Sequence, residues 1–139
     1  AIVCSMHYTI QETVAGEFDD VVEATVAALE AEEFGVLTDI DVRATMAEKL
    51  DADFRNYRIL GACNPPLAHE ALTEEIDLGA LLPCNVVVYE NDDGTIGVSA
   101  VDASVMLSVV DNPALDPIAD EVSERLEGVL SGLPGATPV

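Results

Sequence analysis

One hairpin in the second half of the chain constrains the fold more than any other segment. Residues 84–90, CNVVVYE, form a β-branched run after Pro83, and residues 95–101, TIGVSAV, form a second such run. The residues between them, NDDG, are types that tight turns favour, so the two runs are predicted to pair as antiparallel strands. Such a pair belongs to a sheet, and the flanking segments must supply its other strands and its cover.

Three further segments have the pattern of strands. Residues 2–10 alternate between two faces, one of which carries Ile2, Cys4, Met6, Tyr8 and Ile10. Residues 36–42, VLTDIDV, and the apolar run 57–63, YRILGAC, have strand length and strand composition. The alternation predicts strands that bury one face.

Helical patterns separate these strands. The first helix is marked by the spacing of its apolar residues from Phe18 to Leu29, with Gly35 as its stop, and a short helix follows over residues 43–51. Asn64 resembles an N-cap before two prolines, which predicts a helix over about residues 65–74. A long helix opens at Asp116 and Pro117, while residues 102–107 fit a short helix or an extended arm.

The resulting order is β-α-β-α-β-α-β-β-α, without a repeat or linker that would divide the chain. We therefore expect an α+β fold in which two long helices pack on one curved, mostly antiparallel sheet. A chain of 139 residues can bury a full core as one domain. We expect this domain to cover residues 1–131 and residues 132–139 to be a flexible tail.

The chain is unusually acidic, because 27 Asp and Glu face only 5 Lys and Arg, for a net charge of −22. Repulsion at this charge density is screened over about 3 Å in 1 M salt and about 10 Å in 0.1 M salt, which indicates adaptation to high salt. The same charge argues against nucleic acid and membrane surfaces as partners. No apolar run approaches the roughly 20 residues of a membrane span and no cleavable leader is evident, so a cytoplasmic protein is expected.

The three cysteines, Cys4, Cys63 and Cys84, are too widely spaced for a paired metal or redox motif, and their odd number does not suggest a disulfide framework. Cys63 lies where a strand enters a helix, and a helix N-terminus favours a thiolate. If the strands at 57–63 and 84–90 are antiparallel neighbours, Cys63 and Cys84 could approach each other.

These two thiols and His69 would make a soft-metal set suited to zinc or cuprous copper. The alternative is that each cysteine packs in the core as a small hydrophobic residue and that His69 lies on the helix surface. The residue types favour core packing of the cysteines and a surface position for His69. Asn64 and Asn85 each follow a cysteine and could orient a ligand.

Four of the five basic residues, Arg43, Lys49, Arg55 and Arg58, fall between positions 43 and 58. One interpretation is a small-anion pocket in which Arg55 and Arg58 lie beside the helix N-terminus at Pro65. The other, which the chemistry of arginine favours, is that each arginine pairs with a carboxylate such as Asp39, Asp41 or Asp53.

Three segments together closely resemble the domain-of-unknown-function 302 family of small prokaryotic proteins. They are FGVLTDIDV at residues 34–42, FRNYRILGACNPPLA at 54–68 and LLPCNVVVYE at 81–90. The resemblance implies a TATA-binding-protein-like α+β fold, β-α-β(4)-α with short extra helices, that is commonly dimeric, and it implies no activity. The acidic surface is that of a haloarchaeal-type member, and Glu17 stands where relatives often have a Ser or Thr helix cap.

Three functional hypotheses follow. The first is a non-enzymatic binding or sensing module that holds a small anion or a soft metal around one set of residues: Arg55, Arg58, Cys63, Asn64, His69, Cys84 and Asn85. The second is a thiol enzyme or sulfur carrier with Cys63 as nucleophile, His69 as base and Asn64 as orienting group. The third is a purely structural dimeric module.

The residues identify no cofactor, and hydrolase or kinase motifs such as GxSxG, GxxxxGK and HExxH are missing from the sequence. A homodimer is expected because strands one and five carry few charges, so that part of the sheet is suited to a second subunit.

Overall fold

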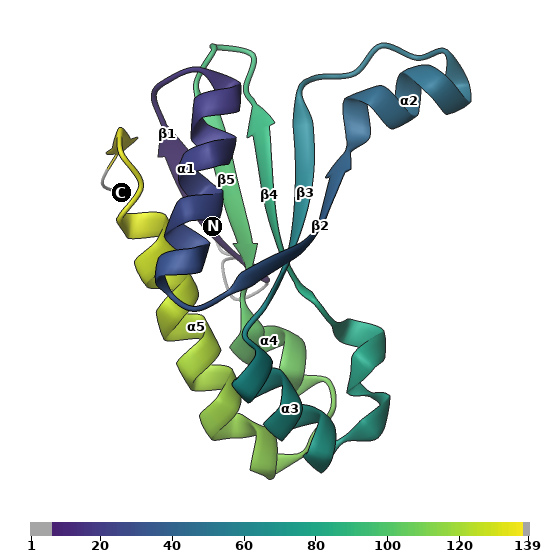
Figure 1. Cartoon of the computed structure of the whole chain (residues 1–139), viewed down its shortest axis with the longest axis vertical. Coiled ribbons are helices and arrows are strands. Elements are labelled where there is room, and N and C mark those ends of the chain that lie inside the picture. Colours follow the sequence, from purple (N-terminus) through teal and green to yellow (C-terminus); the bar gives the residue numbers. More distant parts are fainter. Residues whose placement is uncertain (1–6, 138–139) are drawn as a thin grey trace.

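The computed structural model describes residues 7–137. Its centre is an antiparallel sheet with the strand order β2-β3-β4-β5-β1-β6 (Figure 1). The strands are β1 (Thr9–Val14), β2 (Gly35–Asp41), β3 (Tyr57–Cys63), β4 (Cys84–Glu90), β5 (Ile96–Val101) and β6 (Ala136–Thr137).

Five α-helices connect or follow the strands: α1 (Phe18–Ala31), α2 (Val42–Leu50), α3 (Pro65–Glu74), α4 (Ala103–Ser108) and α5 (Asp116–Ser131). Short 3₁₀ helices occupy Ile76–Leu81 and Pro113–Leu115. Of the five, α1 and α5 are the long ones, and they pack on one face of the sheet and against each other (Figure 1). The predicted α+β class, with two long helices on a mostly antiparallel sheet, is confirmed.

The hairpin predicted at residues 84–101 forms as expected. Val87 lies opposite Ser99 and Tyr89 opposite Gly97 in the β4–β5 pairing. The turn closes with a 2.8 Å hydrogen bond from the Asn91 amide to the Thr95 carbonyl oxygen, and Gly94 adopts a φ of 88°, which favours glycine.

The core lies between the sheet and its two long helices. Strand residues of one parity point toward the helices and are almost fully buried, among them Leu60 on β3, Val88 on β4 and Val98 on β5. From the helices, Leu29 of α1 and Leu126 of α5 are each 0% exposed. The opposite face of the sheet is not covered by either long helix, and we call it the open face.

The first strand differs from its prediction. Within the described residues, strand β1 runs over Thr9–Val14, beyond the predicted end at residue 10, and Tyr8 precedes it and is 69% exposed. In residues 9–14 the charged Glu12 separates Ile10 from Val14, so the apolar alternation is weak there. The strand is set by pairing with β5, in which Val14 lies opposite Ile96. The proposed positions of Ile2, Cys4 and Met6 lie outside the described residues.

The sequence predicts a short helix or an extended arm over residues 102–107 and a flexible tail over residues 132–139, and the described parts of both segments are ordered. Residues 103–108 form α4, because the Asp102 carboxylate accepts hydrogen bonds from the amides of Ser104 and Val105. The expected tail includes Leu133, which is 4% exposed, and Ala136 and Thr137, which pair with β1. Glu17 is the N-cap residue of α1 and makes no side-chain cap hydrogen bond.

Within the described chain, no helix is both long enough and apolar enough to cross a bilayer.

Replacing Leu126 with Ala is expected to lower the free energy of unfolding by about 2–5 kcal/mol, because it leaves a cavity at a fully buried position. The neighbouring change Glu127→Ala, on the exposed side of α5, should change it by no more than about 0.5 kcal/mol. Urea unfolding followed by circular dichroism at constant molar salt measures both. Equal effects of the two substitutions would contradict this assignment of the core.

Candidate functional site

Cys63 and Cys84 lie at the same end of the sheet, as antiparallel pairing predicted. Cys63 is the last residue of β3, and Ala62 lies directly opposite Cys84 at the start of β4. Both residues line an apolar cavity of about 40 Å³ between the sheet, α3, α4 and α5. The cavity has room for little more than one or two water molecules, and its walls include Phe34, Leu67 and Ile118.

Neither thiol is activated. Burial raises the pKa of Cys63, and burial together with the nearby Cys63 raises the pKa of Cys84 to about 11. Both groups therefore remain thiols at neutral pH. Burial opposes the thiolate expected at Cys63, so the structure does not favour this residue as a nucleophile.

The first turn of α3 explains why the helix does not activate Cys63. Pro65 and Pro66 have no N–H group, and the Leu67 amide donates a 3.2 Å hydrogen bond to the Asn64 Oδ1 atom. The Ala68 amide donates to the Asn64 carbonyl oxygen over 2.9 Å. Every N–H of this first turn is therefore missing or already bonded, and none is left for an anion or a thiolate.

The expected metal set is not assembled. His69 lies on the exposed side of α3 and does not line the cavity that Cys63 and Cys84 share. Between residues 7 and 137, no group of three His, Cys, Asp or Glu side chains is placed to hold a metal ion. The geometry of residues 7–137 therefore gives no support to a metal site built from Cys63, His69 and Cys84.

Arg55 and Arg58 do not form an anion pocket with α3. They lie at the start of β3, at the opposite end of the strand from Cys63. Arg58 makes a bidentate ion pair with Asp39 on β2, with hydrogen bonds of 2.7 and 2.5 Å. Arg55 donates to the Glu90 carbonyl oxygen over 3.1 Å and lies 3.7 Å from Asp92.

The alternative interpretation of the arginines is thus confirmed for the Arg58–Asp39 pair. The hydrogen bonds from Arg58 hold the pKa of the Asp39 carboxyl below its usual value. Arg43 lies 3.8 Å from Asp53, and this exposed ion pair contributes little to the stability of the fold.

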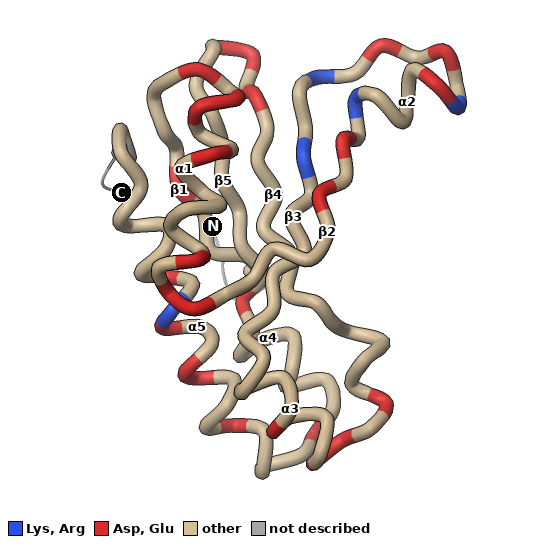
Figure 2. Tube along the Cα trace, viewed as in Figure 1, with Lys and Arg blue, Asp and Glu red and all other residues tan. Residues whose placement is uncertain are grey.

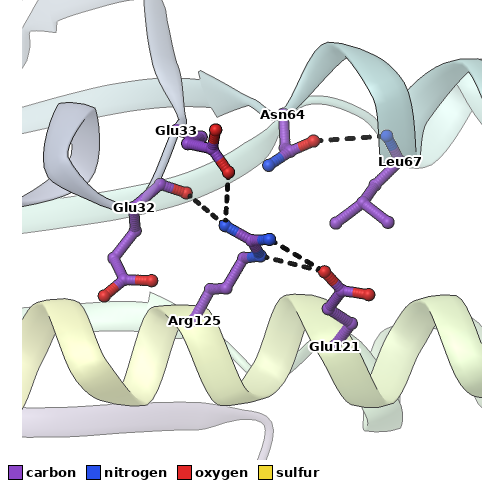
Figure 3. Close-up of polar contacts among 6 residues, drawn as sticks. All are labelled: Glu32, Glu33, Asn64, Leu67, Glu121 and Arg125. Atoms are coloured by element: carbon purple, nitrogen blue, oxygen red, sulfur yellow. Dashed lines mark hydrogen bonds and ion pairs between the residues drawn. The ribbon is translucent and has the colours of Figure 1, made fainter.

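Arg125, which sequence reasoning left unassigned, lies near the start of α3, where Asn64 caps the helix (Figure 3). Its guanidinium donates to the Glu32 carbonyl oxygen (3.1 Å) and to Glu33 Oε1 (3.0 Å). It also donates twice to Glu121 Oε2, over 2.9 and 3.1 Å. Arg125 therefore joins α5 to the end of α1 and has its donors engaged by these groups.

A hollow of about 520 Å³ with a mixed aromatic and polar lining lies on the open face of the sheet. It crosses β3, β4, β5 and β1 and includes the two residues before β1. We call it the open-face hollow, and its lining consists of His7, Tyr8, Thr9, Gln11, Tyr57, Asn85, Val87, Tyr89, Ser99 and Val101.

Two tyrosines from neighbouring strands form one side of the hollow. The rings of Tyr57 and Tyr89 are stacked, with centroids 5.7 Å apart and an interplanar angle of 18°. Gly97 on β5 makes this arrangement possible, because a Cβ atom at that position would lie 2.4 Å from the Tyr89 ring. The glycine lets Tyr89 lie flat across the sheet.

The open face is free of charge, although the chain as a whole is highly acidic. By strand register, the side chains on this face belong to uncharged residues on every one of the five longer strands. They are Thr9, Gln11, Thr13, Thr38, Ile40, Tyr57, Ile59, Gly61, Asn85, Val87, Tyr89, Gly97, Ser99 and Val101. Charged residues are thus confined to other surfaces, which marks the open face as different from the solvated remainder.

Comparison with known proteins decides the family. The model of the family described as "Domain of unknown function DUF302" matches residues 10–133. The chain belongs to the DUF302 family. A crystal structure of an uncharacterized conserved DUF302 protein from Bacillus stearothermophilus has the same fold, with a TM-score of 0.83 and 30% sequence identity over 89% of this chain and 96% of that one. No match was found among the curated proteins.

Sequence reasoning found one lining residue of the hollow in this DUF302 protein, Asn85, and missed the others. Only weak signals pointed to them. Tyr57 and Tyr89 sit on the same parity as Ile59 and Val87, and Gly97 interrupts an otherwise apolar strand. These residues can be recognised as one site only when the register of the strands is known.

We expect both described thiols of the DUF302 chain to react slowly with iodoacetamide near pH 7, because their raised pKa values leave little thiolate. The rate for Cys84 should still be rising near its pKa of about 11, and the half-buried Cys63 should react before it. Mass spectrometry of a Cys4→Ser variant, with free cysteine as control, measures this. A thiol that outpaces free cysteine at neutral pH would contradict the assignment.

Proposed function

We propose that the protein is a non-enzymatic binding module that holds a small, uncharged molecule with a planar ring in the open-face hollow. One observation carries this proposal: a space of about 520 Å³, which falls within the range of small-molecule sites, lies on the charge-free face of a chain with net charge −22.

The residues that line the hollow suit both the planar ring and the uncharged polar groups of the proposed ligand. The stacked rings of Tyr57 and Tyr89 offer an aromatic surface to a planar ring, and such contacts contribute about 0.5–1.5 kcal/mol beyond area burial. The Asn85 amide provides both donors and an acceptor, and Ser99 adds a hydroxyl group. Neither side chain is hydrogen-bonded to another residue in the range 7–137, and Ser99 is 6% exposed.

The lining of the hollow contains no Asp, Glu, Lys or Arg, which suits the electrostatics of the chain. A surface of net charge −22 repels anions at low salt, and molar salt screens charge recognition beyond about 3 Å. Stacking and neutral hydrogen bonds depend much less on ionic strength. Stacking and neutral hydrogen bonds can therefore hold a ligand on this protein both at low salt and in molar salt.

The other hypotheses have less support. The residues proposed for a small anion or a soft metal are divided between opposite ends of β3, and His69 faces away from the thiols. A thiol enzyme or sulfur carrier that uses Cys63 would need a thiolate, which burial opposes. A purely structural module is the outcome in which the hollow binds nothing.

Nicotinamide and nicotinate make a matched test, because they share a planar ring and differ by one negative charge. We expect nicotinamide, and likewise adenosine, to bind wild-type protein in molar salt, and we expect nicotinate and adenosine monophosphate to bind more weakly. Tyrosine fluorescence and isothermal titration measure the affinities. Tyr89→Ala should weaken nicotinamide binding by about 0.5–1.5 kcal/mol through the lost ring contact.

Thr13→Ala is the control variant, because Thr13 lies on the same face of β1 but outside the hollow. It should leave the affinity for nicotinamide unchanged. Binding that Tyr89→Ala and Thr13→Ala affect equally, or no binding of any neutral ring compound at millimolar concentration, would contradict the proposal.

We also propose that the protein works in concentrated salt and in a reducing compartment such as the cytoplasm. Acidic residues are spread over α1, α5, the turns and the ends of the strands (Figure 2). Cys63 and Cys84 are free thiols although they lie at the same end of the sheet, which fits an environment in which thiols stay reduced.

The midpoint of thermal unfolding is expected to rise between 0.1 M and 1 M KCl, because screening of carboxylate repulsion shortens from about 10 Å to about 3 Å. One kcal/mol of added stability corresponds to roughly 2–8 °C for domains of this size range. Circular dichroism melting curves measure the shift, with an equal osmolarity of sucrose as the control. A midpoint that is the same at both salt concentrations would contradict adaptation to salt.

A further inference from the structure

Three sulfur-containing side chains line the apolar cavity at the end of β3. Four cysteine and methionine residues lie between residues 7 and 137, and three of them, Cys63, Cys84 and Met106, line this one cavity. The fourth, Met46, lies on α2 and is not part of the lining. Met106 is distant in sequence from both cysteines, so only the fold brings the three residues together.

Three different elements hold these residues in place. Cys63 ends β3, Cys84 begins β4, and Ala62 lies directly opposite Cys84. Met106 comes from α4, where its amide donates a 2.9 Å hydrogen bond to the Asp102 carbonyl oxygen, and the Asp102 carboxylate caps the helix. The backbone positions are therefore fixed by secondary structure, while the flexible methionine side chain can adjust the place of its sulfur.

The size and lining of the cavity suit a single soft ion. Its volume of about 40 Å³ holds little more than one or two water molecules. Apart from the two thiols, the polar side chain in its described lining is that of Asn64, and no Asp, Glu, His, Lys or Arg is among these residues. Magnesium and calcium need several oxygen ligands, and structural zinc takes four ligands. Thiolate and thioether sulfurs are instead the ligands that select cuprous copper.

From these observations we propose that the cavity is a binding site for one cuprous ion, with Cys63, Cys84 and Met106 as its three sulfur ligands. Met106 takes the place that the sequence pattern suggests for His69, which does not line the cavity. This inference does not depend on what the open-face hollow binds.

Binding of the ion requires no oxidant or reductant. The cuprous ion forms a bond to each cysteine sulfur as the two S–H bonds break, and both protons pass to the buffer. The methionine sulfur binds without losing a proton. One positive charge and two thiolates give the loaded site a net charge of −1. Because burial raises the pKa of both thiols, only an ion with a high affinity for sulfur displaces their protons at neutral pH.

The surroundings of the cysteines provide an entry route and a hydrogen-bond donor. Cys63 is half-buried, whereas Cys84 is 8% exposed, so an ion reaches Cys63 first and Cys84 second. Asn64 also lines the cavity, and its Oδ1 atom accepts the hydrogen bond from the Leu67 amide. This leaves the NH₂ group of Asn64 to donate to a thiolate sulfur, as residues around metal ligands commonly do.

Competition with the chromogenic cuprous chelator bicinchoninate tests the proposal. The measurement is made without oxygen in a Cys4→Ser variant, because Cys4 lies outside the described residues. We expect one cuprous ion per chain, and X-ray absorption of the loaded protein should show three sulfur atoms around the copper. Zinc should bind much more weakly, because the cavity offers three ligands and not four.

Single substitutions in this variant identify the ligands. Loss of a residue that only supports a metal ligand typically costs 10–100-fold in affinity, so Cys63→Ser, Cys84→Ala and Met106→Leu should each weaken cuprous binding by about tenfold or more. Met106→Leu nearly conserves side-chain volume, so it removes the sulfur and keeps the packing. Met46→Leu is the matched control and should leave the affinity unchanged. Circular dichroism confirms that each variant folds.

Three results would overturn the proposal. The first is the absence of competition with bicinchoninate, and the second is a cuprous affinity that Met106→Leu and Met46→Leu change equally. The third is a copper site in which nitrogen or oxygen replaces one of the three sulfur atoms. Met106 does not line the open-face hollow, so nicotinamide should bind the Met106→Leu variant as it binds the wild type. Failure of the copper site and failure of the ring-binding site can therefore be told apart.

Discussion

The antiparallel register of β3, β4 and β5 is the constraint on which the other features depend. It sends Leu60, Val88 and Val98 toward the two long helices and leaves the alternate residues on an open face. The same register stacks Tyr57 on Tyr89 and brings the end of β3 next to the start of β4. A shift by one residue would exchange the two faces, so the core, the hollow and the position of the cysteines have a common origin.

Much of the fold could be predicted from local signals. The bounds of β3, α3 and β4 follow from a strand-length apolar run, from Asn64 with two prolines and from a β-branched segment after Pro83. Strand β1 could not be placed in this way, because Glu12 interrupts the apolar alternation of residues 9–14 and only the pairing with β5 identifies them as a strand. The role of residues 132–137 also depends on distant contacts, since Leu133 finds its place only against the assembled core.

The candidate site could be predicted from the sequence only in part. That Cys63 and Cys84 meet follows from antiparallel geometry alone, and it is observed. That α3 offers no amide to the Cys63 thiol could have been anticipated, because Pro65 and Pro66 have no amide hydrogens and the Asn64 side chain accepts the next one. The position of Arg55 and Arg58 could also be anticipated, since a strand keeps residues that are five or more positions apart at separate ends. The hollow could not be predicted from the sequence, because each strand contributes only a few residues to it and no motif connects them.

The close contact between Gly97 and Tyr89 links two positions that lie on different strands. Any side chain at 97 would have to displace the ring, and a smaller residue at 89 would leave a gap above the glycine. The two positions can therefore change during evolution only as a pair, a glycine with a large ring or a larger residue with a small one. Homologues that keep the first combination should retain a flat aromatic surface here, and those with the second should have lost it.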